Sequence, residues 1–272
     1  MTTRLLSATD LPELIDALTG AELLYVDTEF HSEHRYHPRL YLLQVAADDG
    51  PVWLVDCADL EPLSALGPVM RSAPWVVHGG THDIAILHRA LGGVPDRVWD
   101  TQIMAGLVCT AFPGSFQSLV QDVLATHLDK GATLTNWKRR PLSEEQLQYA
   151  RADVVWLRPL AARLFDQLDT LSRRDIAGAA CDAAREQALE GPEPDEAWRR
   201  LHAARSLDPE RASILRELAA WRERTAAAMA VRAGLVRVGR GGERAAKPSQ
   251  LVAADIELTF EEAERGWRAR RR

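Results

Sequence analysis

The most constraining feature of this chain is a segment that joins a buried-strand pattern to two acidic side chains. Leu-Leu-Tyr-Val leads directly into Asp27-Thr-Glu29-Phe, with Gly20 just upstream. A short apolar run bounded in this way is typical of a buried strand, and residues two apart on a strand point to the same face. Both carboxylates are therefore expected in one pocket, where their repulsion would raise a pKa unless a cation lay between them.

Mg²⁺ or Mn²⁺ is the natural candidate for that cation, because both ions prefer oxygen ligands. By itself the acidic pair is weak support for a metal site. Asp-x-Glu is a common sequence, and a strand that runs out into a polar loop explains it equally simply. The interpretation depends on whether further acids elsewhere in the chain reach the same pocket.

Composition sets limits on the class of protein. With 272 residues, 46% of them hydrophobic, the chain has room for one large domain or for a medium domain and a smaller one. No apolar run approaches the ~20 residues of a membrane span, and no signal-peptide core is present, so a cytoplasmic protein without a membrane partner is expected. Cys57, Cys109 and Cys181 are too widely spaced to indicate a disulfide framework or a zinc site.

Net charge gives no general attraction to nucleic acid. The formal charge is −6, whereas domains that bind nucleic acid are usually basic. A metal-filled acidic pocket and local basic patches can still hold a phosphate chain, so the charge lowers the expectation of tight non-specific binding without excluding it.

The apolar pattern predicts a mixed α/β sheet. Three strands separated by a tight turn at 47–51 indicate an antiparallel start, and later strands alternate with helices. The expected strands are 23–30, 40–46, 52–55 and 75–78, and the expected helices are 10–18, 59–71, 81–91, 115–127 and a long one from 143. Another helix is expected to start within Val98-Trp-Asp100-Thr, where Asp100 is interpreted as a helix cap and not as a metal ligand.

A third acid, Asp83, is expected in the first turn of a helix. It follows His78-Gly-Gly-Thr81 at a strand-to-helix junction. An Asp near a helix N-terminus is favoured by the helix dipole whether or not it does chemistry. The functional alternative is that the strand ending at His78 opens beside the strand ending at Asp27, so that Asp83 meets the first acidic pair.

The helix that begins after Ser143 carries a second informative pair. Ser143-Glu-Glu-Gln146 fits a capping box. Tyr149 and Asp153 are four residues apart and share one face of this helix, while apolar residues on a roughly opposite face can pack on the sheet. A plain surface pair is the alternative interpretation, and Pro159 is expected to strain or kink the helix.

Taken together, three segments resemble the motifs of ribonuclease D, a member of the DEDD 3′→5′ exonucleases. They are Asp27-Thr-Glu29-Phe, His78-Gly-Gly-Thr-His-Asp83, and the stretch from Trp137-Lys-Arg-Arg-Pro to Tyr149-Ala-Arg-Ala-Asp153-Val. The resemblance covers roughly residues 20–170 in order. The third segment is the most specific, and a tyrosine four residues before the last aspartate marks the subgroup.

This resemblance implies an RNase H-like fold, a mixed sheet flanked by helices with the active site at the ends of the central strands. Asp27, Glu29, Asp83 and Asp153 match the four family carboxylates, and Tyr149 matches the family tyrosine. In the implied two-metal scheme the ions lie about 3.5–4 Å apart. Asp27 would touch both ions, Glu29 and Asp153 the nucleophile-side ion and Asp83 the leaving-group-side ion, while Tyr149 would position the attacking water.

The residues that contact substrate are implied less directly. Thr28 and Phe30, which follow the first acid, are expected to contact the terminal ribose and base. His78, Gln44 and Arg139 are weaker candidates. A contact to the 2′-hydroxyl would distinguish RNA from DNA, and no sequence motif here indicates one.

The predicted organisation is an exonuclease domain at 1–175, a linker at 176–194, a partial HRDC-like helical region at 195–235 and an Arg/Gly/Glu-rich tail at 236–272. HRDC domains are the small helical nucleic-acid-binding modules that follow the nuclease in ribonuclease D. The resemblance to such a module covers the Trp198 region and the next helix, and it ends after about Ala233.

The leading functional prediction is a metal-dependent 3′→5′ exoribonuclease that trims RNA 3′ ends, such as those of tRNA precursors, and releases 5′-nucleoside monophosphates. A DNA 3′→5′ exonuclease of proofreading or repair type is the enzymatic alternative, since the same core serves both polymers. A non-catalytic nucleic-acid-binding module is the third possibility, which the complete set of acids disfavours. No obligate protein partner is inferred.

Overall fold

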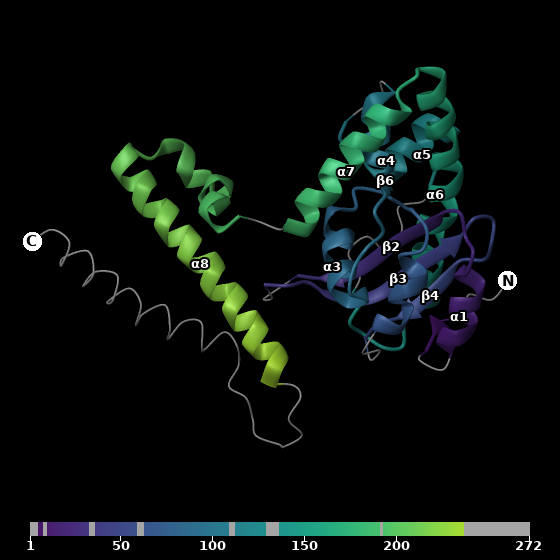
Figure 1. Ribbon diagram of the computed structural model, residues 1–272, viewed down its shortest axis with the longest axis horizontal. Helices are drawn as coiled ribbons and strands as arrows, with labels where there is room; N and C mark the ends of the chain where they lie inside the picture. Colours follow the sequence, from purple (N-terminus) through teal and green to yellow (C-terminus); the bar gives the residue numbers. More distant parts are fainter. Residues whose placement is uncertain are drawn as a thin grey trace, which may run out of the picture.

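A six-stranded mixed sheet lies within the right-hand group of helices in Figure 1. The computed structural model describes residues 5–7, 10–32, 36–58, 63–108, 112–128, 136–190 and 193–236. The strand order is β1-β4-β3-β2-β5-β6. The strands are β1 (Leu5–Leu6), β2 (Leu24–His31), β3 (Arg39–Ala47), β4 (Trp53–Asp56), β5 (Trp75–Val77) and β6 (Val98–Asp100).

Strand pairing follows the predicted pattern. β2, β3 and β4 are antiparallel neighbours, whereas β2 pairs with β5, and β5 with β6, in parallel. Within the β2–β3 ladder, Asp27 lies opposite Gln44 and Glu29 lies opposite Leu42. The prediction of a mixed sheet with an antiparallel start is confirmed.

Helices cover both faces of the sheet. One face packs against α1 (Leu11–Leu18), η2 (Leu63–Leu66), α2 (Gly67–Met70) and α3 (Thr81–Leu91). The other face is crossed by α6 (Glu144–Thr170), with α4 (Thr101–Leu107), α5 (Phe116–Leu124) and α7 (Arg174–Glu190) beside it. This layering is the RNase H-like arrangement expected from the sequence.

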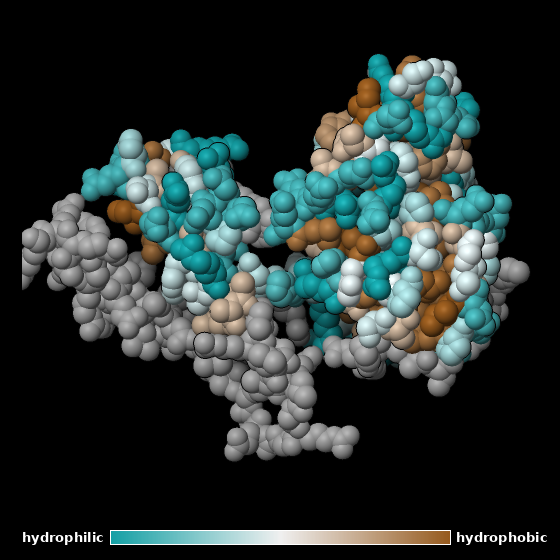
Figure 2. Space-filling view, in the orientation of Figure 1, coloured by the Kyte–Doolittle hydropathy of each residue, from teal (hydrophilic) through white to brown (hydrophobic). Residues whose placement is uncertain are grey.

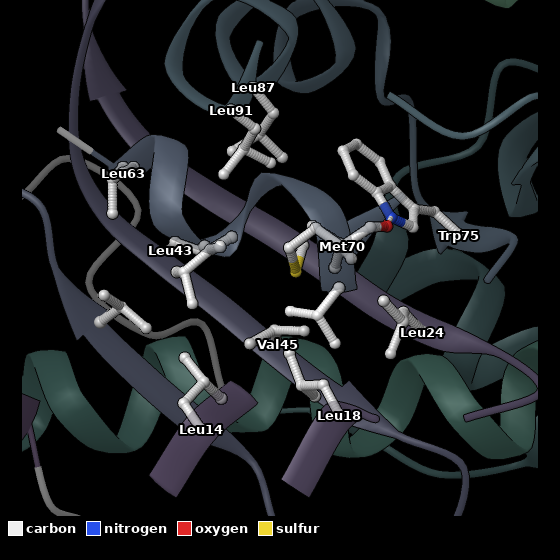
Figure 3. Close-up of a cluster of buried hydrophobic side chains, with 14 of the residues drawn as sticks. Leu14, Leu18, Leu24, Leu43, Val45, Leu63, Met70, Trp75, Leu87 and Leu91 are labelled. Atoms are coloured by element: carbon white, nitrogen blue, oxygen red, sulfur yellow. Dashed lines mark hydrogen bonds between the residues drawn. The ribbon is translucent and has the colours of Figure 1, made fainter. Parts of the chain in front are cut away.

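The core between the sheet and the first group of helices is almost wholly aliphatic (Figure 3). Leu24, Leu43 and Val45 on the sheet face Leu14 and other leucines from the covering helices. The Trp75 indole donates a 2.6 Å hydrogen bond to the Met70 carbonyl, so its polar edge is satisfied inside this core.

Helix α6 continues from Glu144 to Thr170 with Pro159 in its interior, so the proline does not end the helix. Proline removes the hydrogen bond to the carbonyl four residues earlier, here that of Val155. Val155 is exposed, so water can solvate that carbonyl. The buried Leu160 and Leu164, which follow the proline, hold the second half of the helix against the core.

The segment 176–194, expected as a linker, is largely helical. α7 packs against α3 and β6, Ala177 is fully buried, and the Cys181 sulfur accepts a 3.3 Å hydrogen bond from the Asp100 backbone N–H. The small side chains of α7 permit this close approach, so the helix packs as part of the region that contains the sheet.

The C-terminal helices follow α7. They are η3 (Pro194–Arg200), η4 (His202–Ser206) and α8 (Pro209–Val236), and they lie to one side of the sheet in Figure 1. Hydrophilic side chains predominate on the visible face of α8 (Figure 2). The predicted tail after 236 lies outside the described residues. No helix in the described part of the chain is long and apolar enough to cross a membrane.

Arg140 ties the start of the α6 segment to the edge of the sheet. Its Nε donates a 2.6 Å hydrogen bond to the Asp56 carboxylate, and its other nitrogens donate to the Trp137 and Tyr41 carbonyls at 2.7 and 3.1 Å. Burial raises the Asp56 pKa, but the hydrogen bonds and charge of Arg140 outweigh burial and lower it overall. The Arg140–Asp56 pair is thus a structural clamp that holds the segment before α6 against the edge of the sheet.

Arg140→Met is expected to lower the free energy of unfolding by about 1–3 kcal/mol, because it leaves a partly buried carboxylate without its Arg140 partner. Urea unfolding at neutral pH measures the loss. The matched control is Arg174→Met, which breaks a more exposed ion pair with Asp169 and should cost much less stability. Equal losses in the two variants would contradict the clamp.

Candidate active site

Three carboxylates from two elements meet where β2 emerges beneath α6. Asp27 and Glu29 share one face of β2, and Asp153 comes from the overlying turn of α6. One oxygen from each of the three side chains lies within 4.8 Å of the others. The helix is held over the strand by Ala150 and Val154, which are fully buried on its sheet-facing side. The structure thus brings Asp153 next to Asp27, which lies 126 positions earlier in the sequence.

Electrostatics in this cluster favour bound cations. Burial is the main cause that raises the pKa of all three acids, and mutual repulsion raises those of Asp27 and Glu29 further. The pKa of Glu29 rises to about 8 and that of Asp153 to about 7, while that of Asp27 lies well above its ordinary value. Groups packed in this way ionise fully at neutral pH only when positive charge is supplied.

Asp83 lies next to this group and is not part of it. It is buried in the first turn of α3, where it accepts a hydrogen bond from the Thr28 hydroxyl. Burial raises the Asp83 pKa, and the Thr28 hydrogen bond lowers it in part. Asp83 is close enough to raise the pKa values of Asp27 and Glu29, so it borders the three-acid cluster.

Tyr149 lies one helical turn before Asp153 and is hydrogen-bonded to its carboxylate. Burial, followed by the negative charges of Asp153 and Glu29, raises the pKa of Tyr149 above its ordinary value. The phenol therefore stays protonated at neutral pH, and it can act as a hydrogen-bond donor and acceptor but not as a general base.

The carboxylates open into a cavity of about 200 Å³. Its lining residues are Asp27, Thr28, Glu29, His78, Phe116, Tyr149, Asp153 and Leu157. The His78 Nδ1 lies 3.0 Å from the Thr101 hydroxyl, and its ring contacts Phe116 edge-on at 5.3 Å. Burial lowers the His78 pKa, so the ring is neutral at physiological pH.

Phe116 and Leu157 were missed by sequence reasoning. Both are apolar and lie on different helices, α5 and α6, so they resemble ordinary core positions in the sequence. Only the packing of α5 against α6 brings Phe116 to the mouth of the cavity. They add an apolar wall to an acidic pocket, which suits a base or sugar next to a phosphate.

Three of the predicted substrate residues, Phe30, Gln44 and Arg139, are not among the residues that line the cavity. Phe30 packs on the core and against His82, at 5.8 Å between ring centroids. Arg139 is exposed, and Gln44 is fully buried with neither side-chain amide atom hydrogen-bonded. Thr28 lines the cavity, although its hydroxyl is directed to Asp83.

The donor set fits divalent cations of the magnesium type. Asp27, Glu29 and Asp153 each provide a carboxylate oxygen, and oxygen atoms of this kind are the preferred ligands of Mg²⁺ and Mn²⁺. Histidine and cysteine are absent from the described metal-ligand group. The site can therefore bind a phosphodiester through cations, with an apolar wall and a protonated tyrosine beside it.

Comparison with known protein families agrees with this geometry. Residues 5–169 match the model of the 3′-5′ exonuclease family. The ribonuclease D of Desulfotalea psychrophila is 30% identical over 80% of this chain and 59% of its own length. That of Acidiphilium cryptum is 33% identical over 91% of this chain and 62% of its own length. The chain thus spans less than two thirds of the length of these relatives.

Comparison of the fold with solved structures also finds RNase D. The structure of Escherichia coli RNase D, described as an exoribonuclease involved in structured RNA processing, superimposes with a TM-score of 0.73 at 29% identity, covering 84% of this chain and 62% of that one. NrnC of Brucella melitensis, solved with bound Mg²⁺, has a TM-score of 0.56 at 25% identity and covers 69% of this chain and 91% of its own. NrnC has also been solved bound to pGG.

Proposed function

The chain belongs to the 3′-5′ exonuclease family, and from this membership and its acidic cluster we propose that it is a metal-dependent 3′→5′ exoribonuclease of ribonuclease D type. The observation that carries the proposal is the convergence of Asp27, Glu29 and Asp153, with Tyr149 bonded to the last of them. The products would be 5′-nucleoside monophosphates, and tRNA precursors and other structured RNAs are the proposed substrates.

Four acids would hold the cations. Asp27, Glu29 and Asp153 offer oxygens close enough to share an ion, and Asp83 borders them from α3. When bound, Mg²⁺ or Mn²⁺ supplies an activated water and stabilises the charge that develops on the scissile phosphate and the leaving 3′-oxygen. Magnesium bound by NrnC supports a divalent cation here.

Other cavity residues would orient the substrate and the water. Tyr149 can hold a water through its hydroxyl while Asp153 fixes the direction of that hydroxyl. The neutral His78 ring and Phe116 form an apolar edge against which the terminal nucleoside can stack. Thr28 would contribute through its backbone, because its hydroxyl is bonded to Asp83.

RNA is proposed over DNA because the chain is similar in sequence to ribonuclease D proteins and in fold to the structure of RNase D. The C-terminal helices support the same choice. We assign 195–235 as a partial HRDC-like module that helps to hold RNA, and its support is the sequence resemblance together with the hydrophilic side chains on the face of α8 that is visible in Figure 2.

The deciding experiment follows 5′-labelled and 3′-labelled strands, in RNA and DNA versions, with Mn²⁺ and with EDTA. Stepwise shortening of 5′-labelled RNA, early release of the 3′ label and no reaction in EDTA are the expected results. Faster hydrolysis of DNA than of RNA would show that DNA is the preferred substrate. Degradation without metal would contradict the proposed mechanism.

Tyr149→Phe is expected to lower kcat by about 10²-fold while changing the affinity for Mn²⁺ little, because the hydroxyl orients water and ligates no ion. Since the Phe variant also removes a hydrogen bond from Asp153, the comparison is best made near pH 8.5. Single-turnover hydrolysis of an RNA 3′ end gives the rate, and calorimetry gives the Mn²⁺ affinity.

Tyr25→Phe is the matched control for this variant. Tyr25 is also partly buried, has a raised pKa owing mainly to burial, and lies on β2, but it does not line the cavity. Its hydroxyl should be dispensable for hydrolysis. An unchanged rate in Tyr149→Phe would remove the water-orienting role.

A further inference from the structure

Gln44 is a buried amide with no hydrogen-bond partner. It lies in the middle of β3 with 0% of its surface exposed, and neither its Oε1 nor its Nε2 is bonded. Among the polar side chains that are buried in the described ranges, the others are bonded. These are Thr28, Asp83, Asp100, Thr101 and Gln146. An unpaired buried amide is costly, so its presence calls for an explanation.

The register of the sheet identifies its polar neighbour. Gln44 lies directly opposite Asp27 on β2 and opposite Leu54 on β4. Directly opposed residues point to the same face, with Cβ atoms about 4.5–5.5 Å apart. The flanking residues Leu43 and Val45 point into the core on the other face. Gln44 therefore points toward α6, with Leu54 on one side and the Asp27 carboxylate on the other.

A direct contact between Gln44 and substrate does not fit this position. The side chain is fully covered and does not line the cavity. Its neighbour on β4 is Leu54, which belongs to an apolar cluster together with Leu42 and with Ala150 of α6. The amide can act on the reaction only through a neighbour, and Asp27 is the polar residue directly opposite it.

We propose that Gln44 is a positioning residue for Asp27, and that its amide N–H donates a hydrogen bond to the Asp27 carboxylate when cations are bound. The inference rests on the proposed function. A carboxylate offers about four lone-pair sites, more than ligation to cations uses, and a donor on one of the remaining sites fixes its orientation. The amide that has no partner among the described residues is then the donor that holds the Asp27 carboxylate while it ligates a cation.

Gln44→Met tests this role, because methionine fills a similar volume without polar atoms. In EDTA the variant should gain about 2–4 °C in Tm, since an unsatisfied buried amide is removed. Its affinity for Mn²⁺, measured by calorimetry, should fall by about 10–100-fold, and kcat should fall more than KM rises. Mn²⁺ affinity within twofold of wild type would overturn the proposal.

Gln167→Met is the matched control. Gln167 also has a buried and unpartnered side-chain oxygen, but it lies near the far end of α6 and lines a different cavity. A purely structural effect of replacing a buried amide should appear in both variants. Only Gln44→Met should weaken Mn²⁺ binding, and an equal loss of affinity in Gln167→Met would overturn the assignment.

The wild-type protein gives a second readout that needs no folded variant. Titration with diamagnetic Mg²⁺ should move the Gln44 side-chain amide proton resonances downfield along the binding isotherm, as expected for a new hydrogen bond to a carboxylate. Resonances that stay in place while Mg²⁺ binds would overturn the Gln44 role alone. Absence of any Mg²⁺ and Mn²⁺ binding by wild type would instead overturn the proposed function, and this role with it.

Discussion

Asp153→Asn is expected to lower kcat for hydrolysis of RNA 3′ ends by about 10³-fold, because loss of a cation ligand removes several kcal/mol of transition-state stabilisation. Asparagine keeps the shape of the side chain and can still accept the hydrogen bond from Tyr149. The change therefore removes a charge from the cluster and leaves the packing of α6 almost unaltered. The expected loss thus reports on cation binding and not on misfolding.

The same variant should be more stable than wild type when no metal is present. Asp153 raises the pKa values of Asp27 and Glu29 through charge repulsion, so its removal relieves a destabilising interaction. At pH 8 in EDTA we expect the free energy of unfolding to increase by about 1–2 kcal/mol. Activity and stability should therefore move in opposite directions.

Asp166→Asn serves as the control for both measurements. Asp166 is exposed on the same helix and lines the distant cavity near Leu171. Its replacement should leave kcat within about twofold of wild type, since surface substitutions are usually near neutral. If Asp153→Asn retained more than a tenth of wild-type activity, Asp153 would not be a metal ligand.

Local sequence patterns were sufficient to predict the elements that carry the site. The strand expected at 23–30 is β2 at Leu24–His31, and the capping box of Ser143 and Gln146 is present at the start of α6. Asp100 caps α4 as predicted, with its side chain accepting a hydrogen bond from the Gln102 backbone N–H. These features depend on residues close in sequence, where side-chain periodicity and capping chemistry decide the outcome.

Features that depend on tertiary packing were not predictable in the same way. The sequence gives no means to know that the Thr28 hydroxyl turns to Asp83, since the two residues are 55 positions apart. Pro159 looked disruptive because local rules do not register that Val155 faces solvent. The two-residue strand β1 is too short to carry a periodic pattern.

The assignment of Gln44 shows how the two kinds of information combine. The resemblance to ribonuclease D implied only a weaker candidate for substrate binding at this position. Gln44 is fully buried and therefore cannot contact substrate. The β2–β3 register places it opposite Asp27 instead. The residue type indicated a function, but only the sheet register identified its partner.

The stability of the metal-free protein is expected to fall as pH rises from about 7 to 8.5. The pKa values of Asp153 and Glu29 are raised to about 7 and about 8 in the folded state, whereas unfolded carboxyls titrate near ~4. Between these values the folded protein binds more protons than the unfolded chain does. The free energy of unfolding therefore decreases with pH in this window, by about 1.5–2 kcal/mol from these two groups together.

Two histidines set the lower end of the pH range in which the change in the free energy of unfolding reports on the acidic cluster. Burial lowers the pKa values of His37 and His78, so the folded state binds fewer protons than the unfolded chain below pH about 6.5. Their contribution raises stability with pH in that range and opposes the carboxylates. Above pH about 7 the histidines are neutral in both states, and the slope reports on the acidic cluster.

Saturating Mg²⁺ should reverse this decrease in the free energy of unfolding with rising pH. Cations bind the ionised carboxylates of the folded chain and stabilise it by about 2.7 kcal/mol at a concentration 100 times Kd. Because the acids must lose their protons to bind, the stabilisation should be larger at pH 8.5 than at pH 6. Urea unfolding in EDTA and in Mg²⁺, at a series of pH values, measures both curves.

A triple variant isolates the cause of this pH dependence. Asp27→Asn, Glu29→Gln and Asp153→Asn together remove the three clustered charges, so the EDTA curve should become nearly flat between pH 7 and 8.5 and Mg²⁺ should no longer change it. The difference between wild type and variant cancels the titration of other groups. A wild-type protein whose stability in EDTA rose across this window would show that these acids are not held in the repelling cluster that metal-dependent catalysis requires.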